Sequence, residues 1–79
     1  MPIYHVSLSL TRPSTWTDAE LIELFREAIN RAMAITIEIG PAGMVIEADA
    51  GSLELLESAL RTNLEARGGS LERITATQI

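Results

Sequence analysis

Apolar and polar residues alternate strictly near the beginning of the chain. Residues 4–10 carry Tyr, Val or Leu at even positions and His or Ser at odd positions. Successive side chains of a β-strand point to opposite faces, so a period of two predicts a strand with one buried and one polar face. Residues 11–16, with Pro13 and several hydroxyl side chains, predict a loop.

A helix start follows this loop at Thr17. Thr17 and Glu20 have the spacing of a capping box, in which each side chain accepts a hydrogen bond from the backbone N–H of the other residue. Trp16 and Leu21 flank the cap at the spacing of a hydrophobic staple. The apolar stripe of the predicted helix consists of Leu21, Ile22, Phe25, Ala28, Ile29, Ala32 and Met33.

The middle of the chain predicts a β-hairpin. Isoleucines at 35, 37 and 39 alternate with Thr36 and Glu38, which indicates a strand by both period and β-branching. Gly40-Pro41-Ala42-Gly43 is typical of a turn, and residues 44–48 alternate again. The glycines of this turn also allow an anion-binding loop, although a tight hairpin explains them more simply.

The last third of the chain predicts a helix followed by a strand. Asp49 or Ser52 is expected to cap the helix, whose leucines recur at 53, 56, 60 and 64. The pair Gly68-Gly69 is a typical helix end. Alternating Thr and aliphatic residues at 74–77 predict the final strand.

These elements follow one another in the order βαββαβ. Right-handed crossovers place both helices on the same face of one antiparallel sheet of four strands, in the expected order 4-1-3-2. The fold class is therefore α+β, and the arrangement is that of a ferredoxin-like sandwich. We expect residues 1–79 to form one such domain.

Composition narrows the range of functions. The 79 residues carry a net charge of -5, with eleven carboxylates against six basic residues that are all arginine. Nucleic acids and anionic membranes attract positive surfaces, so neither is an expected partner. With no Cys and a single His, we expect no thiolate or multi-histidine metal site and no cofactor. The absence of a long apolar run favours a soluble, cytoplasmic protein.

The sheet face turned away from the helices is the expected place for an interaction surface. Its predicted polar residues are His5, Ser7, Ser9, Thr36, Glu38 and Glu47, accompanied by Val45, Thr75 and Thr77. RNA-binding modules of this architecture carry aromatic residues and positive charge on this face, and both are missing here. The row therefore predicts either an ordinary solvated surface or a surface for a protein partner. His5 beside Ser7 or Ser9 also allows a base and nucleophile, but no orienting acid is identifiable.

One enzyme family resembles the first half of the chain. The opening Met-Pro-Ile, an alternating strand, Arg12 and a helix ending in residues 26–31 are similar to the start of the 4-oxalocrotonate tautomerase family. The resemblance implies that Pro2, once freed by removal of the initiator Met, acts as general base. It also implies that Arg12 binds the carboxylate of the substrate. The similarity covers residues 2–33 and then ends, because a second complete helix replaces the family's later segment.

Two hypotheses of function follow. The first is a non-catalytic interaction, oligomerisation or regulatory module that binds a protein partner or a second copy through its sheet edges or its open face. Residues 34–39 are expected to form a regular edge strand in which only Glu38 discourages pairing. Because the chain stops directly after the last strand, an excised domain and a designed fold without activity are both open. The second hypothesis is a tautomerase-like enzyme that uses Pro2 and Arg12.

Overall fold

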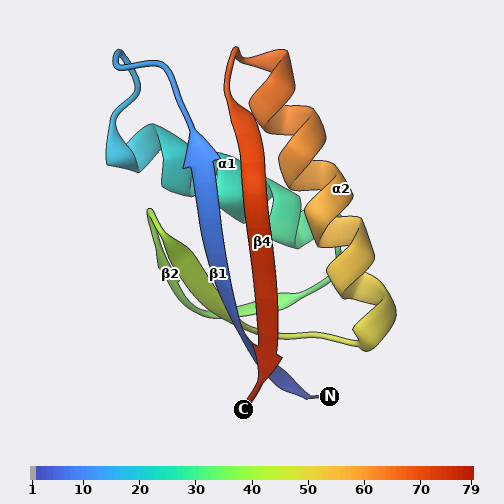
Figure 1. Ribbon diagram of the computed structural model, residues 1–79. Helices are drawn as coiled ribbons and strands as arrows, with labels where there is room; N and C mark the ends of the chain where they lie inside the picture. Colours follow the sequence, from blue (N-terminus) through green and yellow to red (C-terminus); the bar gives the residue numbers. More distant parts are fainter. Residues whose placement is uncertain (1) are drawn as a thin grey trace.

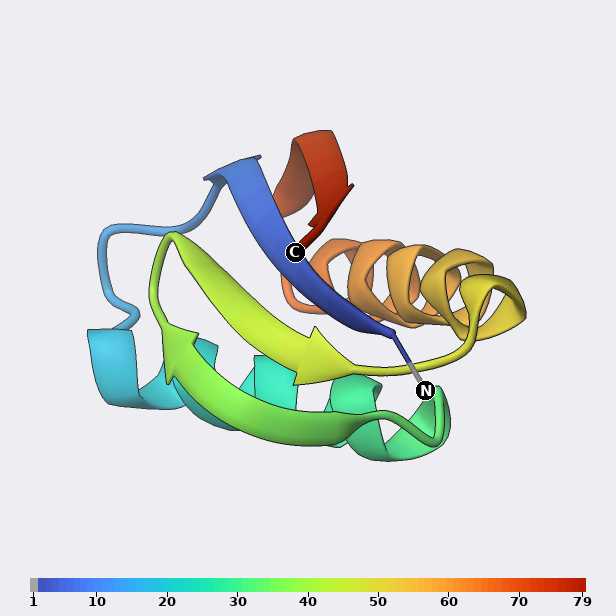
Figure 2. The same cartoon turned by 90° about the horizontal axis from the view of Figure 1, so that it is seen from below.

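The computed structural model describes residues 2–79 and contains the predicted element order. Its elements are β1 (Ile3–Thr11), α1 (Asp18–Arg31), β2 (Ile35–Gly40), β3 (Gly43–Glu47), α2 (Ala50–Ala66) and β4 (Ser70–Gln78). The sheet is antiparallel, and its order β2-β3-β1-β4 is the predicted order read from the other edge. Both helices lie against the same face of the twisted sheet, α1 next to β2 and α2 next to β4 (Figures 1 and 2).

The core lies between this sheet and the two helices. The even residues of β1 face it, as the alternation predicted, and Val6 is fully buried. α1 contributes residues at the helical spacings of three and four, and α2 contributes three of its four predicted leucines. The buried residues are Tyr4, Val6, Leu21, Leu24, Phe25, Ala28, Ile29, Ala32, Met44, Ile46, Ala48, Leu56, Leu60, Leu64 and Leu71.

The predicted caps are confirmed in part. The backbone N–H of Glu20 donates to the Thr17 hydroxyl at 3.2 Å, as in a capping box. Asp49, one of the two residues expected to cap α2, occupies the N-cap position, but its side chain makes no capping hydrogen bond. The C-terminus of α2 ends as predicted, because Gly68 adopts φ of 86° and the N–H of Gly69 donates to the Leu64 carbonyl at 2.8 Å.

The predicted stripe of α1 is wrong at its C-terminal end. The helix ends at Arg31, and Met33 adopts a left-handed φ of 59° with its side chain 82% exposed. The N–H of Ala34 donates back to the Ile29 carbonyl at 3.1 Å, so the chain turns away before Met33 can join the core. Leu24, which the predicted stripe omitted, is buried instead, whereas Ile22 is half-buried.

β2 is not the regular strand that its isoleucine pattern predicted. Thr36 pairs with Ile46 and Glu38 pairs with Val45, so Ile37 between them has no partner in β3 and forms a bulge. Directly opposite residues of two strands project from the same face. Thr36 therefore lies on the helix-facing side with buried Ile46, which corrects its predicted place on the open face.

The β2–β3 hairpin approaches β1 closely at Gly43. A Cβ atom at this position would lie 2.6 Å from the carbonyl oxygen of Val6, which is a backbone atom and cannot move alone. We expect Gly43→Ala to lower the free energy of unfolding by about 1–3 kcal/mol, as overpacking does. Gly51→Ala in α2 is the matched control, because a Cβ atom at Gly51 would have nothing within 4 Å. This substitution should raise the free energy of unfolding by up to about 1 kcal/mol. Urea denaturation measures both, and equal stability of Gly43→Ala and wild type would contradict this contact.

The same substitution at two isoleucines should separate the core from the surface. Ile29 is fully buried on α1, whereas Ile35 on β2 is 53% exposed. Ile29→Val leaves a cavity of one methylene group and should cost about 0.5–1.5 kcal/mol. Ile35→Val should change the free energy of unfolding by less than about 0.5 kcal/mol, as substitutions on the surface usually do. Thermal denaturation of the two variants checks this difference, which would vanish if Ile29 were not in the core.

Candidate interaction surface

The register of the sheet arranges the open face in rows that cross all four strands. Glu47 pairs with Ile3 on one side and with Ile35 on the other. The N–H of Ile79 donates to the Ile3 carbonyl at 2.9 Å, which extends this row beyond the end of β4. The row at this end of the sheet is therefore Ile35, Glu47, Ile3 and Ile79, and we call it the isoleucine row.

The isoleucine side chains of this row are unusually exposed for apolar residues. Ile3, Ile35 and Ile79 are 37%, 53% and 76% exposed, and the bulge residue Ile37 beside them is 53% exposed. The bulge causes the exposure of Ile35, because it shifts the alternation of β2 and turns this side chain away from the helices. Sequence analysis missed these residues, since it assigned the isoleucines of β2 to the buried face. The odd position of Ile3, in phase with His5, was the one available signal.

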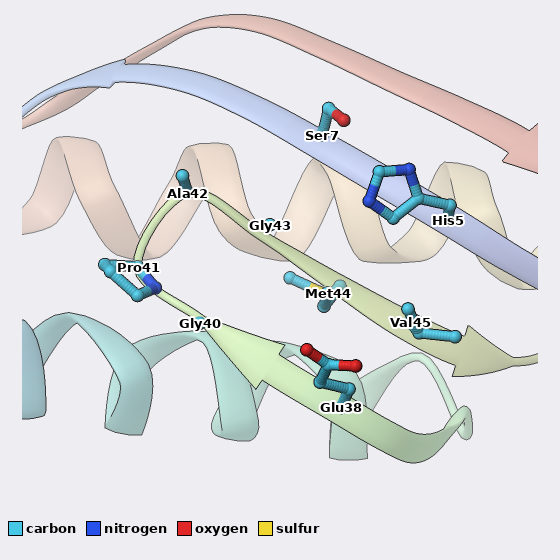
Figure 3. A pocket seen from close by; sticks show the side chains of 9 residues that line it. All are labelled: His5, Ser7, Glu38, Gly40, Pro41, Ala42, Gly43, Met44 and Val45. Atoms are coloured by element: carbon cyan, nitrogen blue, oxygen red, sulfur yellow. The ribbon is translucent and has the colours of Figure 1, made fainter.

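The next rows carry the predicted polar residues around a shallow hollow. Val45 pairs with His5 on one side and with Glu38 on the other, and Gly43 pairs with Ser7 and Gly40 in the following row. Figure 3 shows His5, Ser7 and Glu38 along this hollow, with Val45 on the strand between His5 and Glu38. The hollow measures about 370 Å³ and is lined by His5, Ser7, Glu38, Gly40, Pro41, Ala42, Gly43, Met44 and Val45.

The hollow brings together a His, a Ser and a carboxylate without joining them. His5 and Ser7 lie on β1, and Glu38 lies two strands away on β2, a separation of about 10 Å between backbones at the usual strand spacing. Within residues 2–79 no hydrogen bond or ion pair links the His5 ring to Ser7 or Glu38. Gly40 and Gly43 line the hollow and have no side chains to fill it, so these two glycines of the hairpin determine its shape.

The far end of the open face is polar and internally bonded. The Thr11 hydroxyl donates to Glu72 Oε1 at 2.7 Å, and the Ser9 hydroxyl lies 3.5 Å from Glu72 Oε2. Glu72 occupies a second bulge, because Ser9 pairs with Arg73 and the next residue, Leu10, pairs with Leu71. Ser9, predicted as an interaction residue, therefore already has a partner in the sheet, and the sequence pattern gave no indication of Glu72.

The structure does not bring Pro2 and Arg12 together within one chain. They lie at the two ends of β1, and ten residue steps of a strand span about 33 Å. The guanidinium Nη2 atom of Arg12 forms an ion pair with Asp18 Oδ1 at 2.6 Å. Met1, whose removal the tautomerase resemblance requires, lies outside the described residues. One small substrate in a single chain thus cannot contact both residues.

The comparisons with known proteins add no family to these observations. No family model, no curated protein and no solved structure matches the chain. None of the helices in the described part is both long and apolar enough to span a membrane, and no group of three His, Asp or Glu side chains there is placed to hold a metal ion. Fold and surface define an acidic α+β domain with an exposed isoleucine row on its open face.

Proposed function

We propose that this chain is a ferredoxin-like interaction domain that self-associates through the open face of its sheet. The observation that carries the proposal is the isoleucine row, which gathers exposed aliphatic side chains from β1, β2 and the end of β4 at one end of the face. An exposed apolar patch of several neighbouring side chains with a polar rim is typical of a protein–protein interface. Glu38 and His5 in the next row provide that rim, and Glu47 lies within the row between Ile3 and Ile35.

The magnitudes favour a weak dimer. Ile3, Ile35 and Ile79 together expose somewhat less surface than two fully exposed isoleucines, and burying that much stabilises by roughly 2–5 kcal/mol for each copy. Association costs about 4–15 kcal/mol in lost freedom of motion and ordering. The two terms are of similar size, so the dimer should form and dissociate over an accessible range of protein concentration.

A two-fold axis parallel to the strands gives a compatible arrangement. Such an axis places β2 of one copy over β4 of the other, and therefore Ile35 over the Ile79 side of the partner sheet. The carboxylates of Glu38 and Glu47, on β2 and β3, then face β4 and β1 of the partner and do not meet the same glutamates of the partner. Sheets that pack face to face in this way lie about 10 Å apart with their side chains interdigitated.

Light scattering coupled to size exclusion tests this proposal over a concentration series. We expect the apparent mass to rise toward that of a dimer with increasing concentration. The double variant Ile35→Thr/Ile79→Thr keeps β-branching in the sheet but removes apolar contact, so its dissociation constant should increase by at least tenfold. Leu55→Thr on α2 is the matched control, because Leu55 is 57% exposed and lies outside the open face.

Two results would contradict self-association through this face. One is a monomeric mass for the wild-type chain at every concentration. The other is an equal loss of dimer in Leu55→Thr and in the isoleucine variant, which would place the contact elsewhere. Circular dichroism before each run confirms that the variants are folded.

The tautomerase hypothesis depends on the N-terminus and has its own measurement. A general base at Pro2 requires a free prolyl amine, and a retained Met1 places that nitrogen in a peptide bond. Intact-mass spectrometry of the protein purified from cells distinguishes the two forms. If Met1 is absent, turnover of a 2-hydroxydienoate that is lost in Arg12→Ala would support this enzyme activity against the interaction domain, whereas retained Met1 excludes it.

A further inference from the structure

A second surface lies where α2 and β4 diverge. The two elements meet near the Gly68-Gly69 turn, and Figure 1 shows the distance between them widening toward the other end of β4. The space between them is a groove of about 200 Å³, lined by Val6, Leu53, Leu56, Glu54, Glu57, Ile74 and Ala76. It is separate from the hollow of the open face, because Val6 and Ala76 form a pair on the helix-facing side of the sheet.

The groove has an apolar floor and apolar walls. Val6 and Leu56 are fully buried beneath it, while Leu53 and Ile74 are half-buried along its sides. Ala76 is exposed although it faces the helices, because its side chain is small and α2 lies farther from β4 at this end of the strand (Figure 1). An apolar cavity of about 150 Å³ is enough to hold a benzene molecule, so this groove has room for one or two aliphatic side chains.

The groove runs beside a free sheet edge. β4 pairs only with β1, so its outer edge beside the groove offers unpaired N–H and C=O groups. Nearer the start of the strand, the Leu71 carbonyl accepts a hydrogen bond from Arg61 Nη1 at 3.3 Å. A strand added to this edge would form main-chain hydrogen bonds with β4. Every second side chain of that strand would point to the helix-facing side, where the groove lies.

The rim of the groove is negatively charged. The Glu54 carboxylate has no hydrogen bond or ion pair within residues 2–79, and the Glu57 carboxylate has only a loose 4.0 Å ion pair with Arg61. The protein as a whole carries a net charge of -5. A ligand strand that turns Lys or Arg as well as aliphatic side chains to the helix-facing side would therefore be favoured over an acidic one.

From these observations we infer that the β4 edge and this groove bind an extended segment of another protein. Every second residue of that segment faces the groove, and these groove-facing residues are in turn aliphatic and Lys or Arg. A second copy of the chain fits less well, because two paired β4 edges would bring the glutamates of two α2 helices together. This surface is distinct from the isoleucine row, so the inference goes beyond self-association.

The test uses the full chain carrying Ile35→Thr, in which association through the open face is weakened. The probe is a fluorescently labelled peptide of eight residues in which Val and Lys take turns at every second position and Thr fills the positions between them. Its anisotropy is measured as protein is added. We expect saturable binding, at least tenfold weaker for a peptide of the same composition in which each Val is followed directly by Lys, so that the two residue types point to opposite faces. A peptide in which Glu replaces each Lys should also bind at least tenfold more weakly.

Two variants of neighbouring residues locate the binding surface. Ala76→Trp fills the groove and should weaken binding of the Val–Lys peptide by at least tenfold. Thr77→Trp is the matched control, because Thr77 pairs with His5 and faces the open side of the same strand. The double variant Glu54→Lys/Glu57→Lys should reverse the preference between the Lys and Glu peptides.

Strand addition has a signature that does not depend on these variants folding. Only alternate amides of an added strand face β4, so of two peptides N-methylated at alternate residues, offset by one, one should lose binding and the other should keep it. Loss of binding in neither peptide or in both, helix formation by the bound peptide, or absence of saturable binding would each overturn the inference. Equal loss in Ala76→Trp and Thr77→Trp would also overturn it. None of these results would affect self-association of the wild-type chain, which is measured separately.

Discussion

Pairing of β1 on both of its edges is the constraint that organises this protein. β1 binds β3 through residues near the middle of the chain and β4 through residues at its end. Neither partner is adjacent to β1 in sequence, so a helix has to cross the sheet before each pairing can form. The close approach of Gly43 to the Val6 carbonyl belongs to the same contact, because it sets how near the hairpin can lie to β1. The helices then cover the one face that this arrangement leaves apolar.

The element order and the sheet order were predictable because they rest on local periodicity and on chain handedness. Alternation marks the strands, three-and-four spacing marks the helices, and the capping residues mark their ends. The errors occur where one local rule meets a tertiary contact. Met33 satisfies the helical stripe, yet the chain turns at Ala32 and leaves it in solvent. The bulge at Ile37 breaks a perfect alternation, and no residue of β2 indicates it, since the bulge depends on the register of β2 against β3.

The candidate surface was predictable only in part for the same reason. The odd residues of β1 follow directly from the period of two, so His5 and Ser7 lie on the open face as expected. The exposure of Ile35 depends on the bulge, and that of Ile79 depends on where β4 ends. The groove beside β4 depends on the angle between α2 and the sheet. Such an angle arises from the packing of leucines on two elements together, which neither pattern contains by itself.

The bulge of β2 has a further consequence for the behaviour of the protein at high concentration. Residues 35–40 combine three isoleucines with a threonine and no proline, a composition prone to stacking into fibrils. A flat edge of this kind would serve as a template for added chains without limit. The unpaired Ile37 twists the strand and interrupts its row of backbone groups, while Glu38 adds charge there. The same irregularity that presents isoleucine for a closed pair of molecules thus hinders open-ended growth from this edge.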